Sequence, residues 1–122
     1  MTLQRKSLNT PDDARSFPNG EMAVVHLGGV TVARGVMQPG WRWSKDVKPI
    51  AGTDSCEVPH VGYVVSGRVH VRMDDGTEAE YGPGDVMAVP PGHDGWVVGD
   101  EPYVALEWAG HADDFARPVG TQ

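Results

Sequence analysis

Glycine and proline divide this sequence into short segments, and their spacing constrains the fold more than any other feature. The chain has 16 glycines and 10 prolines among 122 residues, spread along its whole length. Between these turn residues, apolar and polar side chains alternate. In segment 68–73, RVHVRM, the apolar Val69, Val71 and Met73 fall on one side and the polar residues on the other. Short alternating segments bounded by turns predict an all-β, antiparallel fold.

The alternation predicts about nine short strands. Segments 21–27 and 30–37 flank Gly28-Gly29, a pair suited to a hairpin turn. Further strands are expected at 61–67, 68–73, 77–81, 86–90, 95–99 and 103–110. Residues 40–57 alternate little and are expected to form a long loop. Thr10 followed by Pro11 is a helix-start pattern, so one or two helical turns are expected there.

Size and charge limit the class of protein. A chain of 122 residues is expected to form one domain. Its net charge of −7, with no basic stripe, argues against a nucleic-acid partner. No apolar run has the length of a signal peptide or a membrane span. A single cysteine, Cys56, cannot form an internal disulfide, so we expect a cytoplasmic protein with no membrane partner.

Two stretches of the sequence resemble the conserved motifs of the cupins. In YGPGDVMAVPPGHDGWVVG, Gly84 opens the second motif, Pro90 to Gly92 supply its Pro-x-Gly, and the frame continues onto Gly95 and Gly99. HVGYVVSGRVHV resembles the end of the first motif. The resemblance implies a cupin-like β-barrel of the jelly-roll or double-stranded β-helix type, and a homodimer. On this basis we expect one domain, with an N-terminal arm at about 1–20, a barrel core at about 21–110 and a C-terminal tail at 111–122.

The resemblance also implies positions for metal ligands. Cupins typically hold a metal through three histidines and one glutamate, and the equivalent positions here are Asp54, Cys56, His60 and Gly95. Gly95 has no side chain and cannot be a ligand. His93 lies two residues earlier, on the same side of an extended chain, so it is the candidate replacement. Cys56, His60 and His93, with Asp54 as a further candidate, would offer donors suited to Zn²⁺, Ni²⁺, Mn²⁺ or Fe²⁺.

A metal-free interpretation of the same residues stays open. His93 lies in a turn-rich stretch, and a lone cysteine is often a buried apolar residue. Cys56 acting as a nucleophile with His60 would need a third group to orient the histidine. Glu107 alternates with alanines, and we expect it at an exposed edge rather than in the cavity.

The aromatic residues suggest a lined pocket, because small-molecule sites are mainly apolar with few polar groups. Arg42, between two of these aromatics, is expected to be exposed. The expected pocket walls are Trp41, Trp43, Tyr63, Trp96 and Trp108.

These observations predict a small-molecule-binding cupin of unassigned activity with a non-standard divalent metal site. The alternative is a non-catalytic, metal-free module for ligand binding or sensing. A third hypothesis is a cysteine-dependent enzyme. Whether the protein is an enzyme stays open, because one cupin fold hosts many chemistries.

Overall fold

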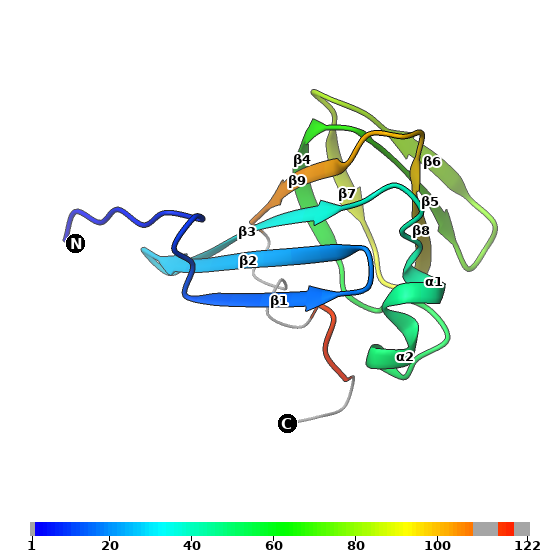
Figure 1. Cartoon of the computed structure of the whole chain (residues 1–122), viewed down its shortest axis with the longest axis horizontal. Coiled ribbons are helices and arrows are strands. Elements are labelled where there is room, and N and C mark those ends of the chain that lie inside the picture. Colours follow the sequence, from blue (N-terminus) through cyan, green and yellow to red (C-terminus); the bar gives the residue numbers. More distant parts are fainter. Residues whose placement is uncertain (1, 109–114, 119–122) are drawn as a thin grey trace.

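The computed structural model describes residues 2–108 and 115–118, and this part of the chain contains nine strands and two short helices (Figure 1). The strands before the helices are β1 (Asp13–Phe17), β2 (Gly20–Leu27) and β3 (Val30–Met37). The helices are α1 (Trp43–Asp46) and α2 (Lys48–Ala51). The later strands are β4 (His60–Ser66), β5 (Arg68–Met73), β6 (Glu78–Tyr81), β7 (Val86–Val89), β8 (His93–Val98) and β9 (Tyr103–Glu107).

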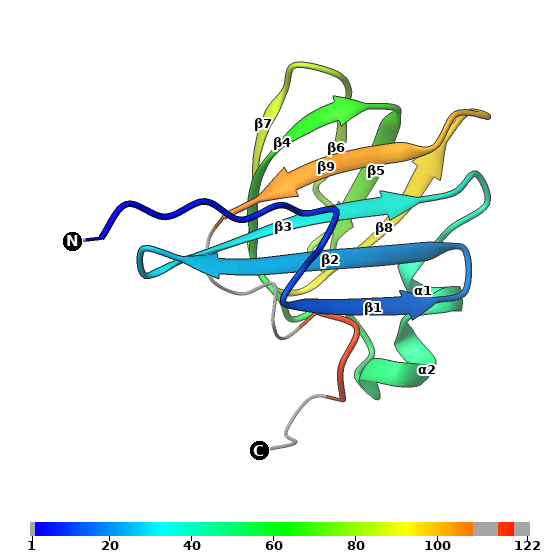
Figure 2. The ribbon, with the colours of Figure 1, turned by 60° about the vertical axis from the view of Figure 1, so that its left-hand side comes forward.

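The strands form two antiparallel sheets. One has six strands in the order β1-β2-β3-β9-β4-β7, and the other has three in the order β6-β5-β8. Figure 2 shows the long strands of the first sheet running across one layer, with β5 and β8 crossing behind them. The all-β, antiparallel, jelly-roll prediction is therefore confirmed, although the sheets are not joined by hydrogen bonds into a closed barrel among the described residues.

The core lies between the two sheets, as the period-two pattern predicts. Val24 and Val64 of the larger sheet have no exposed surface, and Val69 and Val71 of β5 are buried opposite them. The polar residues of β5 point outward, which agrees with the predicted division of segment 68–73. Burying apolar area in this way is the main stabilising contribution to such a fold.

The turn between β2 and β3 is the one that the glycine pair predicts. Gly28 and Gly29 have φ values of 58° and 77°, the left-handed backbone that a two-residue type I′ hairpin requires at both positions. The pairing of Leu27 with Val30 closes this hairpin directly.

The predictions for two segments were wrong. The expected helical turn after Pro11 is instead strand β1, whose residues pair with β2 from Asp13↔Val24 to Phe17↔Gly20. Pairing with an available sheet edge therefore overrides the local capping pattern. The predicted N-terminal arm 1–20 accordingly includes a strand of the sheet, and of the predicted tail 111–122 only residues 115–118 are described.

The expected loop 40–57 contains α1 and α2. Trp43, Val47 and Ala51 are 2%, 1% and 7% exposed. They follow one another at intervals of four residues, a helical spacing that places all three on one buried side. The sequence analysis missed this helical pattern because it has only three apolar residues and is surrounded by glycines and charged residues.

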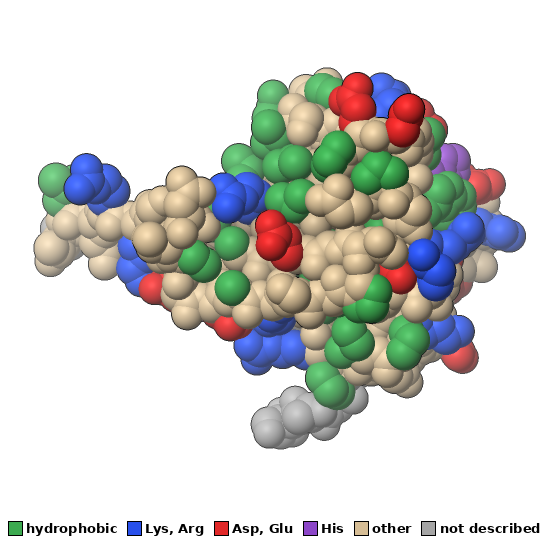
Figure 3. Space-filling view, viewed as in Figure 1, with side chains coloured by type: hydrophobic (Ala, Val, Ile, Leu, Met, Phe, Trp, Pro, Cys, Tyr) green, Lys and Arg blue, Asp and Glu red, His purple; other side chains and the backbone are tan. Residues whose placement is uncertain are grey.

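The outer face of the larger sheet carries apolar side chains. Figure 3 shows hydrophobic side chains gathered over β3, β9 and β4, with charged groups around them. Tyr63, Val65 and Val86 are among the exposed large hydrophobic residues. The helices in the described part of the chain are all too short and too polar to cross a membrane.

Candidate metal centre

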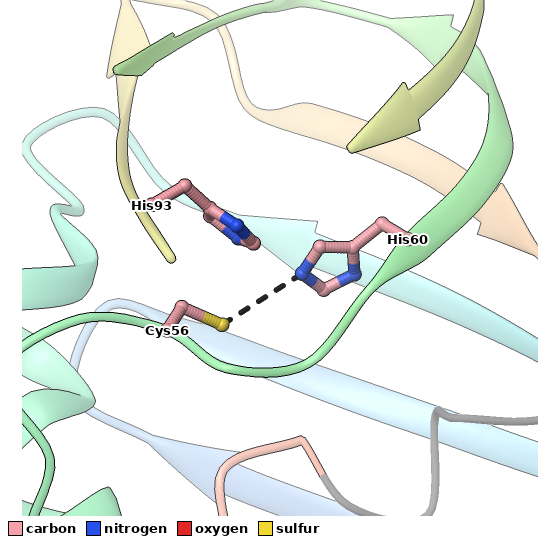
Figure 4. Close-up of side chains that lie close together, drawn as sticks. All are labelled: Cys56, His60 and His93. Atoms are coloured by element: carbon pink, nitrogen blue, oxygen red, sulfur yellow. Dashed lines mark hydrogen bonds between the residues drawn. The ribbon is translucent and has the colours of Figure 1, made fainter. Parts of the chain in front are cut away.

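Three candidate ligands come together from separate segments. Cys56 lies in the loop after α2, His60 begins β4 and His93 begins β8. An isolated antiparallel bridge joins two of them, because the Cys56 N–H donates to the His93 carbonyl at 2.7 Å and the His93 N–H donates back at 3.2 Å. The three side chains point toward one another (Figure 4).

The donor atoms of these residues are close and buried. Cys56 Sγ lies 3.8 Å from His60 Nε2, and one potential ligand atom from each of the three residues lies within 4.8 Å of the others. Cys56 and His93 are 2% and 5% exposed, and the His60 side chain is 11% exposed. A tetrahedral zinc with ordinary Zn–S and Zn–N bonds has S···N edges of about 3.6 Å. The donor set therefore fits a single ion with small side-chain movements.

Both histidines are oriented through their Nδ1 atoms. His60 Nδ1–H donates to Glu107 Oε1 at 2.6 Å, and His93 Nδ1–H donates to the Pro90 carbonyl at 2.8 Å. Because these partners only accept hydrogen bonds, each ring carries a proton on Nδ1, and Nε2 is the nitrogen that could bind an ion. Metal-ligating histidines are usually held in this way by a carboxylate or a backbone carbonyl.

Glu107 is the site residue that the sequence analysis missed. It ends β9, where its side chain is only 14% exposed. Tyr103 and Ala105 of the same strand are buried, and residues at intervals of two share one side. The two-residue spacing from Tyr103 and Ala105 could have placed Glu107 on the inner side of the sheet. The sequence analysis instead expected Glu107 at an exposed edge.

Gly62 makes room for this arrangement. It pairs with Glu107 across the β4–β9 ladder. A methyl group on Gly62 would collide with the Leu106 carbonyl oxygen and come within 3.0 Å of Glu107 Cγ. The absence of a side chain at Gly62 thus allows β9 to bring Glu107 to His60.

The protonation of the cluster favours an ionised sulfur. Burial raises the pKa of Cys56, but hydrogen bonds from His60 and then His93 outweigh it and lower that pKa to about 7. Burial lowers the pKa of His60, while the Glu107 charge and then the hydrogen bond with Cys56 raise it to about 10. Without an ion, these shifts favour a thiolate beside an imidazolium above about pH 7. A thiolate is the form of cysteine that binds metals or attacks electrophiles.

A cavity of about 60 Å³ opens beside the two histidines. Trp41 and Trp43 line it, as the sequence analysis expected of them. Gly95 lines it too, without a donor atom. The other polar residues in its wall are Glu107 and Tyr103, and the apolar ones are Met37, Val69, Val71, Met87, Val89 and Phe115.

Phe115 covers the site from the C-terminal side. Its ring is 3% exposed and packs edge-on against the rings of His60 at 5.7 Å and Phe17 at 5.8 Å. Arg15 of β1 donates to the Phe115 carbonyl at 2.9 Å. This contact ties the described C-terminal residues to the first strand.

Three of the five expected pocket walls lie outside the cavity. Tyr63 and Trp108 are 39% and 42% exposed. Trp96 lies on the outer side of β8, where His70 stacks on it at 4.8 Å and the Arg42 guanidinium lies 4.2 Å from its ring centre. Its neighbours in β8 with the opposite parity are the ones that face inward.

Asp54, the further candidate ligand, is also outside the cluster. Its side chain is fully exposed and lies 3.8 Å from Lys48 Nζ. The loop between Asp54 and Cys56 therefore does not carry the carboxylate toward the histidines.

Comparison with solved structures gives the same fold. A protein of unknown function from Rhizobium leguminosarum is similar with a TM-score of 0.57 and 20% identity, over 88% of this chain and 96% of its own. KdgF from Halomonas is similar with a TM-score of 0.55 and 22% identity, over 80% and 84%. The polyketide cyclase RemF from Streptomyces resistomycificus is similar with a TM-score of 0.60 and 17% identity, over 88% and 78%.

Comparison of the sequence with known families is more specific. No curated protein matches the chain. The model of the EutQ-like cupin domain matches residues 36–104, which is more than half of the 122 residues and includes every member of the histidine–cysteine cluster. The two jelly-roll sheets and this match agree with the motifs in the sequence, and the chain therefore belongs to the EutQ-like cupin family.

Proposed function

We propose that Cys56, His60 and His93 hold one divalent metal ion and that the protein binds a small polar metabolite in the cavity beside it. One sulfur and two imidazole nitrogens suit Zn²⁺ best among the candidate ions, because Mn²⁺ prefers oxygen ligands and Zn²⁺ accepts sulfur and nitrogen together. Ni²⁺ and Fe²⁺ are the next candidates.

The observation that carries this proposal is the pair of Nδ1 hydrogen bonds. Glu107 and the Pro90 carbonyl each hold one imidazole with Nε2 free beside the cysteine sulfur. A cluster that served only packing would not need both rings held at Nδ1 by hydrogen-bond acceptors. Binding of an ion would release the proton that His60 Nε2 and the Cys56 sulfur otherwise share.

Bound zinc acts as a Lewis acid that polarises an oxygen of a bound molecule. The protein's part is to orient the bound groups: Glu107 keeps the His60 ring in place, and Phe115 and the apolar walls surround the bound molecule. RemF, which has the same fold, is a polyketide cyclase, so this fold houses at least one enzyme. We propose acid–base or Lewis-acid chemistry on a small polar molecule.

Metal analysis of the purified protein tests the proposal. After loading with Zn²⁺ and removal of excess metal, the wild type is expected to contain about one zinc per chain, and Cys56→Ala, His60→Ala and His93→Ala are expected to lose it. His70→Ala is the matched control, because His70 lies outside the cluster on β5 and should leave zinc content unchanged. A wild type that retains no Zn²⁺, Ni²⁺, Mn²⁺ or Fe²⁺ would instead favour a metal-free binding module.

One observation favours a second candidate, a cysteine nucleophile. Cys56, His60 and Glu107 form a continuous chain of hydrogen bonds, and Glu107 is the orienting third group that nucleophilic catalysis requires. Against this, Cys56 is 2% exposed and does not line the described cavity. Rapid alkylation of the metal-free protein by iodoacetamide, slowed in His60→Ala and Glu107→Gln, would support the nucleophile. Alkylation only after unfolding would rule it out.

A further inference from the structure

Phe115 stands between two spaces in the interior of the protein. On one side is the cavity of about 60 Å³ beside the histidines, and on the other is a smaller cavity of about 10 Å³ that Cys56 lines. Phe115 and Trp43 line both cavities. Trp43 is fixed at the start of α1, whereas Phe115 belongs to the C-terminal segment 115–118, which we call the strap. Movement of the strap would therefore join the two cavities at Cys56.

Polar contacts at the surface hold the strap to β1. The strap runs beside β1, and both ribbon views draw it in red (Figures 1 and 2). Arg15 donates to the Phe115 carbonyl at 2.9 Å. Arg117 donates to Asp13 Oδ2 at 3.0 Å, and Arg15 donates to the same oxygen at 2.7 Å. The Arg117 side chain is 52% exposed, and ion pairs so open to water contribute little to stability.

The main apolar attachment of the strap is the Phe115 ring. This ring is 3% exposed and contacts the rings of Phe17 and His60 edge-on. Ala116 is only partly buried, and residues 117 and 118 are exposed. Opening of the strap therefore exposes one aromatic ring and little else. Such a local opening needs much less free energy than unfolding of the sheets.

The backbone of the strap is strained directly after Phe115. Ala116 has a φ of 55°, in the left-handed region. In that region the β-carbon of an L-residue comes close to the following carbonyl oxygen, which raises the energy of the conformation. A residue other than glycine keeps this conformation only where surrounding contacts hold it. The closed strap is therefore opposed by its own backbone and held by the Phe115 ring and by β1.

We propose that residues 115–118 form a strap that opens while the two sheets stay folded, and that this opening lets ions and small molecules reach Cys56 and the cavity. Because Cys56 is 2% exposed, a reagent can reach its sulfur only when part of the structure moves. The inference adds an entry route to the proposed function, but it does not require that an ion is bound.

Thiol labelling tests the strap, because Cys56 is the single cysteine of the chain. The full-length protein, treated with a chelator to remove any bound metal, is labelled with iodoacetamide in water and in urea well below the unfolding transition. Opening of the strap exposes little surface, so the labelling rate of the wild type should hardly change with urea. Labelling through global unfolding would instead rise steeply with urea.

Two substitutions in the strap should change the labelling rate in opposite directions. Arg117→Ala removes the exposed ion pair and should speed labelling by about 2- to 5-fold, the effect of one surface ion pair. Ala116→Gly should slow labelling by about 2- to 5-fold, because glycine adopts the left-handed backbone without strain. Arg68→Ala is the matched control and should label like the wild type, since Arg68 pairs with Glu80 at 2.9 Å and is also 52% exposed.

Phe115→Ala removes the apolar attachment itself. It should speed labelling by about 10- to 100-fold, which corresponds to the loss of one buried aromatic ring. Arg117→Ala and Ala116→Gly alter an exposed and a partly buried position, so they keep the test valid if Phe115→Ala does not fold.

Three results would each overturn the inference. These are a wild-type labelling rate that rises steeply from the lowest urea concentrations, no labelling of the folded protein, and equal rates in the wild type, Arg117→Ala and Ala116→Gly. Metal analysis is a separate measurement, so the two proposals can fail independently. A protein without zinc whose labelling follows the strap variants would contradict the proposed function alone, whereas stoichiometric zinc with labelling only through unfolding would contradict the strap alone.

Discussion

Glu107 shows how one residue outside the ligand set controls the site. Its carboxylate accepts the His60 Nδ1–H at 2.6 Å. Glu107→Gln should reduce zinc affinity by about 10- to 100-fold, as the loss of such a partner does in other metal sites. Competition with a chelating dye would measure the change. Glu101→Gln, at an exposed position in the β8–β9 turn, is the control and should bind zinc like the wild type. Equal affinity in Glu107→Gln would show that the carboxylate does not support the ligand.

Tyr103 makes the stability of the protein sensitive to alkali. Burial raises the pKa of Tyr103, and the Glu107 charge raises it further. The phenol of the unfolded chain loses its proton near pH 10, while the folded protein keeps it. Above that pH the unfolded state binds fewer protons, so stability falls by about 1.4 kcal/mol per pH unit from this group.

Comparison with Tyr103→Phe isolates that contribution. Urea unfolding between pH 9 and pH 11 should show a steeper loss of stability in the wild type than in the variant. Parallel curves for the two proteins would contradict the assignment. All other titrating groups are common to both proteins and cancel in the difference.

Among single elements, the contact of β4 with β9 links strand packing to the site. Gly62→Ala would push against the Leu106 carbonyl and the Glu107 side chain. We expect a loss of stability of about 1–3 kcal/mol, typical of overpacking, together with weaker zinc binding because Glu107 is displaced. Chemical denaturation and a zinc titration measure the two effects.

Gly35→Ala is the matched control for Gly62→Ala. Gly35 is also a buried strand glycine, but its added methyl would meet only the flexible ends of Met37, at 3.4 Å, and Met22, at 3.7 Å. It should cost less stability and leave zinc affinity unchanged. Normal zinc affinity in Gly62→Ala would mean that Glu107 reaches His60 without the close approach of the strands.

The sequence predicted the strands well because each needs only local alternation, as in Val69 and Val71 of β5. It failed for α1 and β1 because their states depend on distant partners: β1 forms by pairing with β2, and Trp43 and Val47 bury a side against the core. Neither partner is visible in a short window of sequence.

Motif spacing identified two members of the cluster, Cys56 and His60, whereas His93 and the pocket walls required strand parity. Trp96 is three residues after His93 and Tyr63 is three after His60, so in each pair the side chains face opposite sides. If His60 and His93 face the cavity, Tyr63 and Trp96 must therefore face away from it. The same rule places Glu107 on the cavity side, because it lies two residues after Ala105, which is buried between the sheets.

For the whole molecule, the metal would link the two sheets. His60 belongs to the six-stranded sheet and His93 to the three-stranded one. An ion that binds only the folded state at 100 times its dissociation constant stabilises it by about 2.7 kcal/mol, which corresponds to a Tm increase of about 10 °C for a domain of this size. Differential scanning calorimetry with and without Zn²⁺ should show this increase in the wild type and in His70→Ala.

The increase should be absent in His93→Ala, which keeps a single histidine in the cluster. A Tm that does not respond to zinc in the wild type, despite stoichiometric binding, would mean that the ion does not distinguish the folded from the unfolded chain.

The distribution of the four tryptophans has an optical consequence. Trp41 and Trp43 are 6% and 2% exposed in the wall of the cavity, whereas Trp96 and Trp108 lie on the outside of the sheets. The intrinsic fluorescence of the folded protein therefore combines a buried, blue-shifted pair with a pair that aqueous iodide can quench. Replacing Trp96 and Trp108 by phenylalanine would leave only the tryptophan emission of Trp41 and Trp43. These two residues would then serve as an intrinsic fluorescent probe of the cavity.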